Sequence, residues 1–326
     1  MKDIGILGMP YSGKSTLFAA LTRSASAPGR ASEAVVEIRD ERLEVLARLE
    51  GVERVVRARI RFVDVPGGLT AQAIARFREM DALCLLVRAF GYDAHPAREL
   101  EELQAELLLA DLATVEGSLE KTRKRARVAK EARAELDVLE RAHSLLVSER
   151  PLREAGFEPQ AQLALKGYGL LTLKPAVVVA NVGEGGELPE GLPADALTVS
   201  AGLEAEVAGM EEAEAAELLA GFGIKESGLE RVVSACYGAL DLVTFLTIGE
   251  HETRAWEVPR GATARDAAGV IHSDLQRGFI RAEVISYDEL VAAGSWEAAK
   301  SKGMLRVEGK DYVVEEGDVL RVRFAV

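Results

Sequence analysis

The sequence predicts an α/β fold in which a doubly wound, mostly parallel sheet is interrupted by an antiparallel coiled-coil helical arm and followed by a small α+β domain. Short apolar runs typical of buried strands alternate with helical segments in residues 2–87 and recur near residue 176. A long stretch between them has the apolar spacing of a helical seam. After residue 242 the chain changes to short strands separated by turn residues. We therefore expect the α/β domain at residues 1–97 and 151–241, the arm at 98–150 and the C-terminal domain at 242–326.

Length and composition describe a globular chain. Its 326 residues suffice for two or three domains with a buried core. No apolar run approaches the roughly 18 residues of a membrane span, and the first residues enter a strand and not a signal peptide, so we expect a cytoplasmic protein with no membrane partner. The net charge of −13 argues against DNA as a partner and against bulk coating of RNA, although a local basic patch is still able to bind phosphates. The two cysteines, Cys84 and Cys236, are expected to be buried thiols.

The first strand, at residues 2–7, leads into a glycine-rich loop and then a helix. Residues 8–16 read GMPYSGKST and fit the phosphate-binding pattern GxxxxGKS. The glycines let the loop turn its backbone amides inward around an anion, and the helix N-terminus adds partial positive charge. In this pattern Lys14 reaches the β and γ phosphates, Ser15 holds Mg²⁺ and Thr16 lies near the α phosphate. We expect nucleotide contacts from Gly8, Tyr11, Ser12, Gly13, Lys14, Ser15 and Thr16.

The next elements are a small-residue loop at 24–32, a capped helix at 40–49 and a strand at 58–65 that ends in DVPG. The carboxylate of Asp64, at the end of this strand, is expected to approach Mg²⁺ through water, and the amide of Gly67 to bind the γ phosphate. The DxxG pattern is common by itself. Its place one strand after a phosphate loop makes it informative.

Strands at 82–87 and 174–180 complete the predicted sheet, and the second one leads into Asn181, the only asparagine of the chain. GTPases carry NKxD at this position, where the Asp accepts two donors from guanine, whereas adenine offers one amine and a ring acceptor. Here Val182 replaces the Lys that covers the base and Glu184 replaces the Asp, which favours adenine. The next apolar strand ends at Ser200 and Ala201, the usual position of a backbone contact to the base.

The predicted arm has one glycine and no proline between residues 97 and 147, and its apolar or small residues recur every three or four positions. A single helix of this length would extend about 75 Å, so we expect an antiparallel hairpin whose turn no glycine or proline marks. Residues 121–133 hold seven Lys or Arg. This cluster is either a grip for RNA phosphates or a solvated helical face. The residues expected to contact RNA are Arg123, Lys124, Arg125 and Arg127.

The C-terminal segments TFLTIG, TRAWEV, FIRAEVI and VLRVRFAV read as short strands, with one helix expected at 263–275. They predict a small mixed sheet with its own core.

In this order, the motifs closely resemble those of the YchF family of Obg-related P-loop ATPases. The resemblance rests on GMPYSGKST, DVPG, LLLADLATVE, LKPAVVVANVGE and RAWEVPRGATARDAAGVIHSDLQRGFIRAEVISYDEL followed by EGKDYVVEEGDVLRVRF, and it spans nearly the whole chain. It implies a P-loop NTPase domain with a coiled-coil insertion and a C-terminal TGS domain of ubiquitin-like fold. It also implies a preference for ATP over GTP, weak hydrolysis and association with ribosomes.

Departures from the family's pattern concern hydrolysis. The segment before DVPG is short and has no Thr for magnesium, so Ser26 or Ser32 would have to substitute. The segment after DVPG is truncated, and Gly68 stands where Ras-like enzymes place a water-orienting Gln. The resemblance assigns the role of the family's loop histidine to His95, for which a surface loop histidine is the alternative.

We therefore expect slow ATP hydrolysis in which Lys14, with Mg²⁺ held by Ser15 and Asp64, stabilises the transferred charge. The expected partners are ATP or GTP and, through the basic arm and the C-terminal domain, the ribosome or RNA. An ordinary GTPase in which Glu184 simply replaces Asp is one alternative. A non-catalytic adaptor whose ribosome binding is gated by nucleotide is another, and the shortened loops support it.

Overall fold

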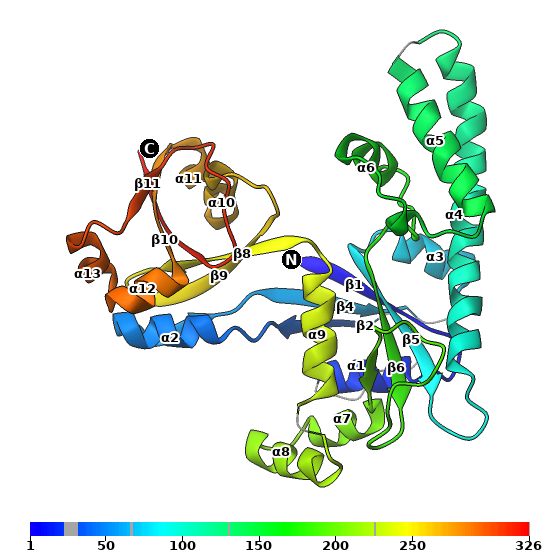
Figure 1. The fold of residues 1–326 in the computed structure, drawn as a ribbon, viewed down its shortest axis with the longest axis horizontal. Coiled ribbons are helices and arrows are strands. Elements are labelled where there is room, and N and C mark those ends of the chain that lie inside the picture. Colours follow the sequence, from blue (N-terminus) through cyan, green and yellow to red (C-terminus); the bar gives the residue numbers. More distant parts are fainter. Residues whose placement is uncertain (23–31, 66–67, 130, 225, 326) are drawn as a thin grey trace. The chain divides into compact units, whose positions relative to one another are not determined.

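The computed structural model describes residues 1–22, 32–65, 68–129, 131–224 and 226–325. It contains two compact units (Figure 1): Met1–Val36 with Arg61–Ala239, and Glu37–Ile60 with Leu240–Val326. Among the described residues, no helix is both long enough and apolar enough to cross a membrane.

The first unit is built on a sheet with the strand order β2, β4, β1, β5, β6, β7. The pairs β1–β5, β5–β6 and β6–β7 are parallel. Because the order runs outward from β1 in both directions, the doubly wound α/β fold is confirmed. The strands are β1 (Lys2–Leu7), β2 (Ser32–Glu37), β4 (Arg59–Asp64), β5 (Ala82–Ala89), β6 (Ala176–Val182) and β7 (Leu197–Val199).

Helices cover both faces of this sheet, as the continuous apolar run of β5 requires. Leu83, Leu85 and Val87 share a buried cluster with side chains of α3 (Ala71–Phe77) and α4 (Pro96–Ala126). Cys84 faces the other way, and its thiol contacts that of Cys236 on α9 (Gly228–Gly238), so both cysteines are buried as expected. Figure 1 shows α1 (Lys14–Thr22) and α9 on one side of the sheet and α3 and α4 on the other. Two further helices of this unit are α7 (Ala201–Val207) and α8 (Glu212–Gly221).

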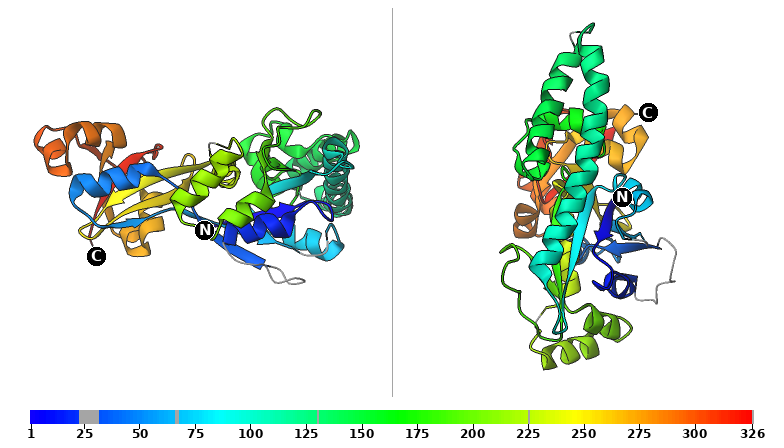
Figure 2. Two further views of the ribbon diagram at one scale, coloured as in Figure 1. Left: turned by 90° about the horizontal axis from the view of Figure 1, so that it is seen from below. Right: turned by 90° about the vertical axis from the view of Figure 1, so that its right-hand side faces the viewer.

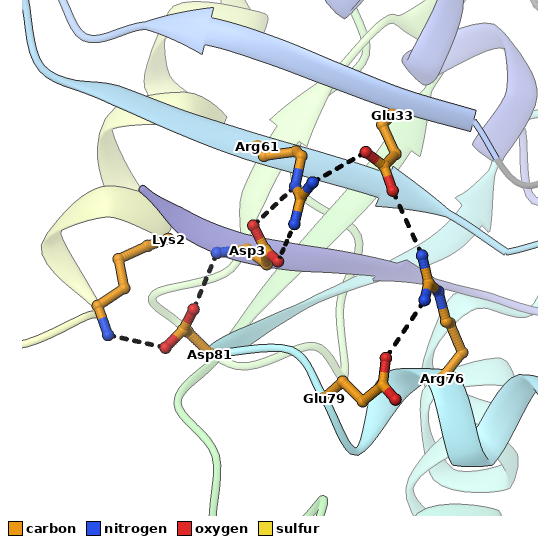
Figure 3. Close-up of polar contacts among 7 residues, drawn as sticks. All are labelled: Lys2, Asp3, Glu33, Arg61, Arg76, Glu79 and Asp81. Carbon is orange, nitrogen blue, oxygen red and sulfur yellow. Dashed lines mark hydrogen bonds and ion pairs between the residues drawn. The ribbon is translucent and has the colours of Figure 1, made fainter.

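A chain of ion pairs joins β1, β2, β4 and α3 (Figure 3). Arg61 on β4 binds Asp3 on β1, with Nε to Oδ1 at 2.8 Å, and Glu33 on β2 at 2.9 Å. Arg76 on α3 reaches Glu33 at 3.3 Å, and the backbone N–H of Asp3 donates to Asp81 at 2.9 Å. Partly exposed pairs contribute only about 0–1 kcal/mol each, so these contacts add modestly to the packing of α3 and the strands.

The arm is an antiparallel pair of helices, α4 and α5 (Glu131–Val147), which lie side by side in both views of Figure 2. Polar contacts cross between them from Glu116 to His143 and from Arg123 to Glu140, so residue numbers rise on one helix as they fall on the other. The buried seam contains Val115 and Leu119 of α4, with Leu139, Ala142 and Leu146 of α5, as the periodicity predicts. After the arm, η1 (Leu152–Glu154) and α6 (Pro159–Lys166) pack on the same cluster.

The turn of the arm, which the sequence did not locate, follows α4 at Arg127. This residue has right-handed helical dihedrals, φ −69° and ψ −26°. Such a conformation is open to any residue, so the C-cap of α4 itself requires no glycine.

The second unit has a mixed sheet in the order β11, β10, β12, β8, β9, β3. The pairs β12–β8 and β3–β9 are parallel, and β10–β11, β10–β12 and β8–β9 are antiparallel. Its core contains Phe245, Val258, Val284 and Leu320. The strands are β3 (Arg54–Val56), β8 (Leu242–Ile248), β9 (Glu252–Pro259), β10 (Phe279–Ser286), β11 (Arg306–Glu308) and β12 (Asp318–Phe324).

Residues 37–60 differ from the prediction, which placed them in the α/β domain. They form α2 (Glu41–Glu50) and β3 and belong to the second unit. β3 pairs with β9, the hydroxyl of Thr253 donates to the carbonyl oxygen of Leu43 at 3.4 Å, and the backbone N–H of Trp296 donates to Glu50 at 2.5 Å. These contacts join segments about 200 or more residues apart in the sequence. Local sequence patterns do not predict contacts over such separations.

The prediction of a single C-terminal helix at 263–275 was also wrong. The chain forms α10 (Ala264–Ile271) and α11 (Ser273–Arg277), because His272 between them is extended, with φ −164° and ψ 144°. Two further helices, α12 (Tyr287–Ala293) and α13 (Trp296–Ser301), follow β10.

Candidate nucleotide-binding site

The predicted phosphate loop connects β1 to α1 and depends on its two glycines. A Cβ on Gly8 would lie 2.4 Å from the carbonyl oxygen of Leu86, and a Cβ on Gly13 would lie 2.1 Å from Nδ2 of Asn181. Gly13 also has a φ of +94°, a conformation that disfavours side chains. Between them Tyr11 has a φ of 67° and is 90% exposed, whereas Ser12 is fully buried. The loop therefore has the strained, tightly packed backbone of a ligand cradle.

Lys14 lies inside this loop. Its Nζ donates to the carbonyl oxygens of Gly8 at 2.7 Å and Met9 at 2.8 Å. Burial lowers the pKa of Lys14, and the carboxylates of Asp64 and Glu99 oppose that shift. The ammonium is thus held at the loop by oxygen atoms, in a position from which phosphate oxygens are able to take over its hydrogen bonds.

The predicted magnesium ligands fit the chemistry of that ion. Asp64 ends β4 and is 9% exposed; burial raises its pKa and the Lys14 ammonium opposes the rise. Ser15 and Thr16, in the first turn of α1, are exposed. Mg²⁺ prefers oxygen ligands and is usually held by one or two carboxylates together with substrate phosphates, so a hydroxyl and one carboxylate at a phosphate loop are a sufficient set.

Two predicted residues of the neighbouring loops, Gly67 and Ser26, lie outside the described residues. Ser32 begins β2. Gly68 has a φ of +65°, and no heavy atom lies within 4 Å of the position that its Cβ would occupy.

Asn181, at the end of β6, is a brace between two loops. Its Nδ2 donates to the carbonyl oxygen of Ser12 at 3.0 Å, and its Oδ1 accepts from the backbone N–H of Ala201 at 3.0 Å. Ala201 follows Ser200, which caps α7. Ser200 and Ala201 are predicted to offer a backbone contact to the base, and in this structure the N–H of Ala201 is bonded to Asn181. One N–H of the Asn181 amide is left for a ligand.

The other residues predicted to contact the base differ in their exposure to solvent. Val182 is 7% exposed and packs in the core cluster, so its side chain offers little surface to a base. Glu184 is exposed. Phe90, which the sequence reading missed, is 37% exposed and comes within 4.0 Å of the Cβ position of Gly13. Its place just after β5, at the carboxyl edge of the sheet, was the signal that could have identified it.

His95 is exposed at the N-cap of α4. The surface hollow beside it is lined by Ala94, Pro96, Ala97, Arg98 and Glu190, none of which belongs to the phosphate loop.

One turn further along α4, Glu99 interacts with Lys14. Its Oε2 accepts from the backbone N–H of Arg88 at 3.1 Å, and its Oε1 is buried with no partner among the described residues. Burial raises the pKa of Glu99. No sequence motif marks this residue.

Three residues of the arm's basic cluster form ion pairs with glutamates of the arm. Arg123 pairs with Glu140 at 3.0 Å, Lys124 pairs with Glu120 at 2.9 Å, and Arg125 pairs with Glu135. No carboxylate among the described side chains pairs with Arg127, which is exposed. The arm is therefore less cationic at its surface than its lysines and arginines alone indicate.

Comparison with known proteins covers both units. Residues 3–113 match the family model of the 50S ribosome-binding GTPases. Residues 242–325 match the C-terminal model of YchF GTPases, described as a protein of unknown function (DUF933).

Full-length relatives include a protein from Haemophilus ducreyi named ribosome-binding ATPase YchF, 40% identical over 358 aligned positions that cover 99% of each chain. A Bacillus subtilis protein of the same name is 36% identical, again over 99% of each chain. The solved structure of the Schizosaccharomyces pombe YchF GTPase superposes with a TM-score of 0.87 at 28% identity and covers 99% of this chain and 97% of that one.

Proposed function

The chain belongs to the YchF family, and on that premise we propose that it binds ATP with Mg²⁺ in preference to GTP, hydrolyses it slowly and couples the bound nucleotide to ribosome binding. The observation that carries this proposal is the phosphate loop. Two sterically required glycines, the enclosed Lys14 and the carboxylate of Asp64 converge at the ends of β1 and β4.

Each residue of the loop would have a defined task. The backbone amides and the N-terminus of α1 would receive the phosphates, and Lys14 would exchange the carbonyl oxygens of Gly8 and Met9 for phosphate oxygens. Ser15 and Asp64 would hold Mg²⁺, directly or through water. When bound, the ion supplies positive charge against the phosphate oxygens.

The preference for adenine rests on Glu184 and Asn181. Glu184 is exposed and three residues beyond the brace, where GTPases place the Asp that pairs with guanine. The remaining N–H of Asn181 suits an acceptor on the base, and the exposed ring of Phe90 is able to cover the base face. GTP binding is the alternative, in which Glu184 takes the role of the Asp.

Slow hydrolysis is proposed because no heavy atom of a described residue lies within 4 Å of the Cβ position of Gly68, and because the hollow that His95 lines contains no residue of the phosphate loop. The alignment with the Haemophilus ducreyi relative runs over 358 positions although this chain has 326 residues, so part of the aligned length has no counterpart here. A nucleotide-gated adaptor without catalysis remains the second candidate, and these shorter segments favour it.

The ribosome is proposed as the partner because relatives over the full length are named ribosome-binding ATPases. Three of the four basic residues expected to meet RNA are already paired with glutamates of the arm. We therefore expect these three residues to add little attraction to RNA phosphates, and of the four we assign the larger contribution to Arg127.

The test is a calorimetric titration of Mg-ATP into the wild-type protein and into Lys14→Ala, followed by measurement of ATP turnover for both. We expect the variant to bind about 10- to 100-fold more weakly, because a hydrogen bond to a charged group contributes about 1.5–3 kcal/mol. Equal affinities would refute the proposed site. Tight binding with turnover no faster than that of Lys14→Ala would identify the adaptor.

Ribosome association is tested by sedimentation with purified ribosomes. Simultaneous charge reversal at Arg123, Lys124, Arg125 and Arg127 is compared with Arg127→Glu alone. We expect both proteins to sediment with ribosomes nearly as well as the wild type. A complete loss in the quadruple variant, with its melting temperature unchanged, would show that the arm is the main grip after all.

A further inference from the structure

Arg78 caps the C-terminus of α3 and places its guanidinium against α4, where the arm begins. Its Nη2 donates to the carbonyl oxygen of Ala110 at 2.9 Å and to the hydroxyl of Thr114 at 2.8 Å, both on α4. Its Nη1 donates to the carbonyl oxygen of Gly169 at 3.0 Å and to Oδ1 of Asp111 at 3.2 Å. One side chain from α3 thus holds both α4 and the connector that precedes β6.

Asp111 completes this arrangement from α4. Its side chain is fully buried and accepts from the backbone N–H of Leu171 at 2.9 Å, the N–H of Thr172 at 2.7 Å and the hydroxyl of Thr172 at 2.8 Å. A buried carboxylate needs such partners to offset the loss of water, so the contacts favour a single geometry. We call this group of residues the arm joint: Arg78, Ala110, Asp111, Thr114, Gly169, Leu171 and Thr172.

The returning end of the arm is tied to the same connector. Arg153, on η1, donates to the carbonyl oxygens of Thr172 and Lys174, both at 3.1 Å. Its backbone N–H also donates to the carbonyl oxygen of Thr172 at 2.9 Å. Both helices of the arm are therefore tied to residues 169–174. Arg78 connects these residues to α3.

α3 connects the arm joint to the candidate nucleotide site. It begins at Ala71, seven residues after Asp64 (71 − 64), and ends at Phe77, so it is about 10 Å long. Arg76 also pairs α3 with Glu33 on β2 (Figure 3). α3 therefore follows the strand that carries Asp64 and is capped by Arg78, so a displacement of α3 would move the guanidinium.

We propose that the arm joint relays the state of the nucleotide site to the helical arm, with Arg78 as the residue that couples α3 to α4. The inference rests on the proposed nucleotide binding. It adds the route by which the bound nucleotide affects the helices of the arm. From Asp111 to Ala126 α4 runs 15 residues without interruption (126 − 111), or about 23 Å. A tighter or looser joint would change how often these helices open locally, and amide exchange reports that opening.

Hydrogen exchange of the full chain, measured by mass spectrometry with and without Mg-ATP, tests the relay. In the wild type we expect protection of the phosphate loop together with a change in exchange of about fivefold or more in residues 112–147, the lower end of typical coupling. In Arg78→Ala the phosphate loop should still be protected, while residues 112–147 no longer respond. Arg78→Lys should also lose most of the response, because one ammonium is unable to span the four acceptors.

The matched control is Arg98→Ala. Arg98 is an exposed arginine near the start of α4 whose ion pair, at 2.9 Å, is with Glu102 on the same helix. Its arm should respond to Mg-ATP like that of the wild type. If Arg78→Ala proves unfolded by circular dichroism, Thr114→Val serves instead, because it removes one acceptor of Arg78 and retains the size of the side chain. Partial loss of the arm response is then expected, and an unchanged response overturns the relay.

The outcomes separate the relay from the proposed function. If Mg-ATP protects the phosphate loop of the wild type but leaves residues 112–147 unchanged, the relay is wrong and nucleotide binding stands. The same conclusion follows if the arm of folded Arg78→Ala responds like the wild type. If Mg-ATP protects neither region, the proposed function is itself wrong and the relay falls with it.

Discussion

Replacing Asn181 with Ala tests whether this residue braces the phosphate loop or reads the base. The change removes the hydrogen bonds of 3.0 Å to Ser12 and 3.0 Å to Ala201. It leaves a carbonyl oxygen and an N–H without partners in two fully buried residues. Each unsatisfied group costs about 1–3 kcal/mol, so the free energy of unfolding should fall by about 2–6 kcal/mol.

The effect on ligands separates the two roles. A brace that positions the loop matters to any triphosphate, so Asn181→Ala should weaken ATP and inorganic triphosphate by the same factor, about tenfold or more. The matched variant is Glu184→Ala. Because Glu184 is exposed and forms no hydrogen bond or ion pair with another described residue, its loss should weaken ATP but not inorganic triphosphate.

The assays are calorimetric titration of each ligand with Mg²⁺ and urea unfolding of the unliganded proteins. The reasoning is refuted if Asn181→Ala unfolds at the same urea concentration as the wild type and binds inorganic triphosphate equally well. Loss of ATP affinity alone would show that Asn181 acts on the base.

Further predictions concern the loop, its lysine and acid stability. Gly13→Ala should abolish measurable ATP binding, because its Cβ would lie 2.1 Å from Asn181 Nδ2. Gly117→Ala on α4 should bind normally, because no atom lies within 4 Å of its Cβ position. Equal binding by both variants would contradict the tight packing of the loop at Gly13. Glu99→Gln should tighten Mg-ATP binding about fivefold in a titration, since it removes an anion that competes with phosphate for Lys14, and weaker binding would argue against that competition. Although burial alone would raise the pKa of Asp81, the hydrogen bonds from Lys2 and from the backbone of Asp3 lower it overall. A lowered pKa stabilises the fold above the unfolded value of about 3.9. Asp81→Asn should therefore be less stable than the wild type at pH 7, and the difference should vanish as the pH falls through the pKa of the folded carboxyl; a difference that persists at lower pH would exclude this source of stability.

The features that the sequence predicted best are those with local patterns. The phosphate loop is contained in nine residues, its strand and helix adjoin it, and Asp64 and Asn181 each follow an apolar strand whose carboxyl end must lie at the same edge of a parallel sheet. The seam of the arm was predicted for the same reason, because Val115 and Leu119 repeat at helical spacing within one segment.

The features that were missed depend on contacts between distant segments. β3 is only three residues long, and its partner β9 lies almost 200 positions away. The glutamates that neutralise Arg123 and Arg125 come from the opposite helix of the hairpin, so the register of the hairpin was needed to pair them. The role of Asn181 as a brace likewise required the positions of Ser12 and Ala201, which lie 169 and 20 residues away.

We propose that this phosphate loop binds ATP in preference to GTP. Displacement calorimetry on the intact chain with Mg²⁺, in which each nucleotide competes against the other, measures that preference directly. We expect ATP to bind more tightly by about tenfold or more, which is about 1.4 kcal/mol. Equal or tighter binding of GTP would contradict it.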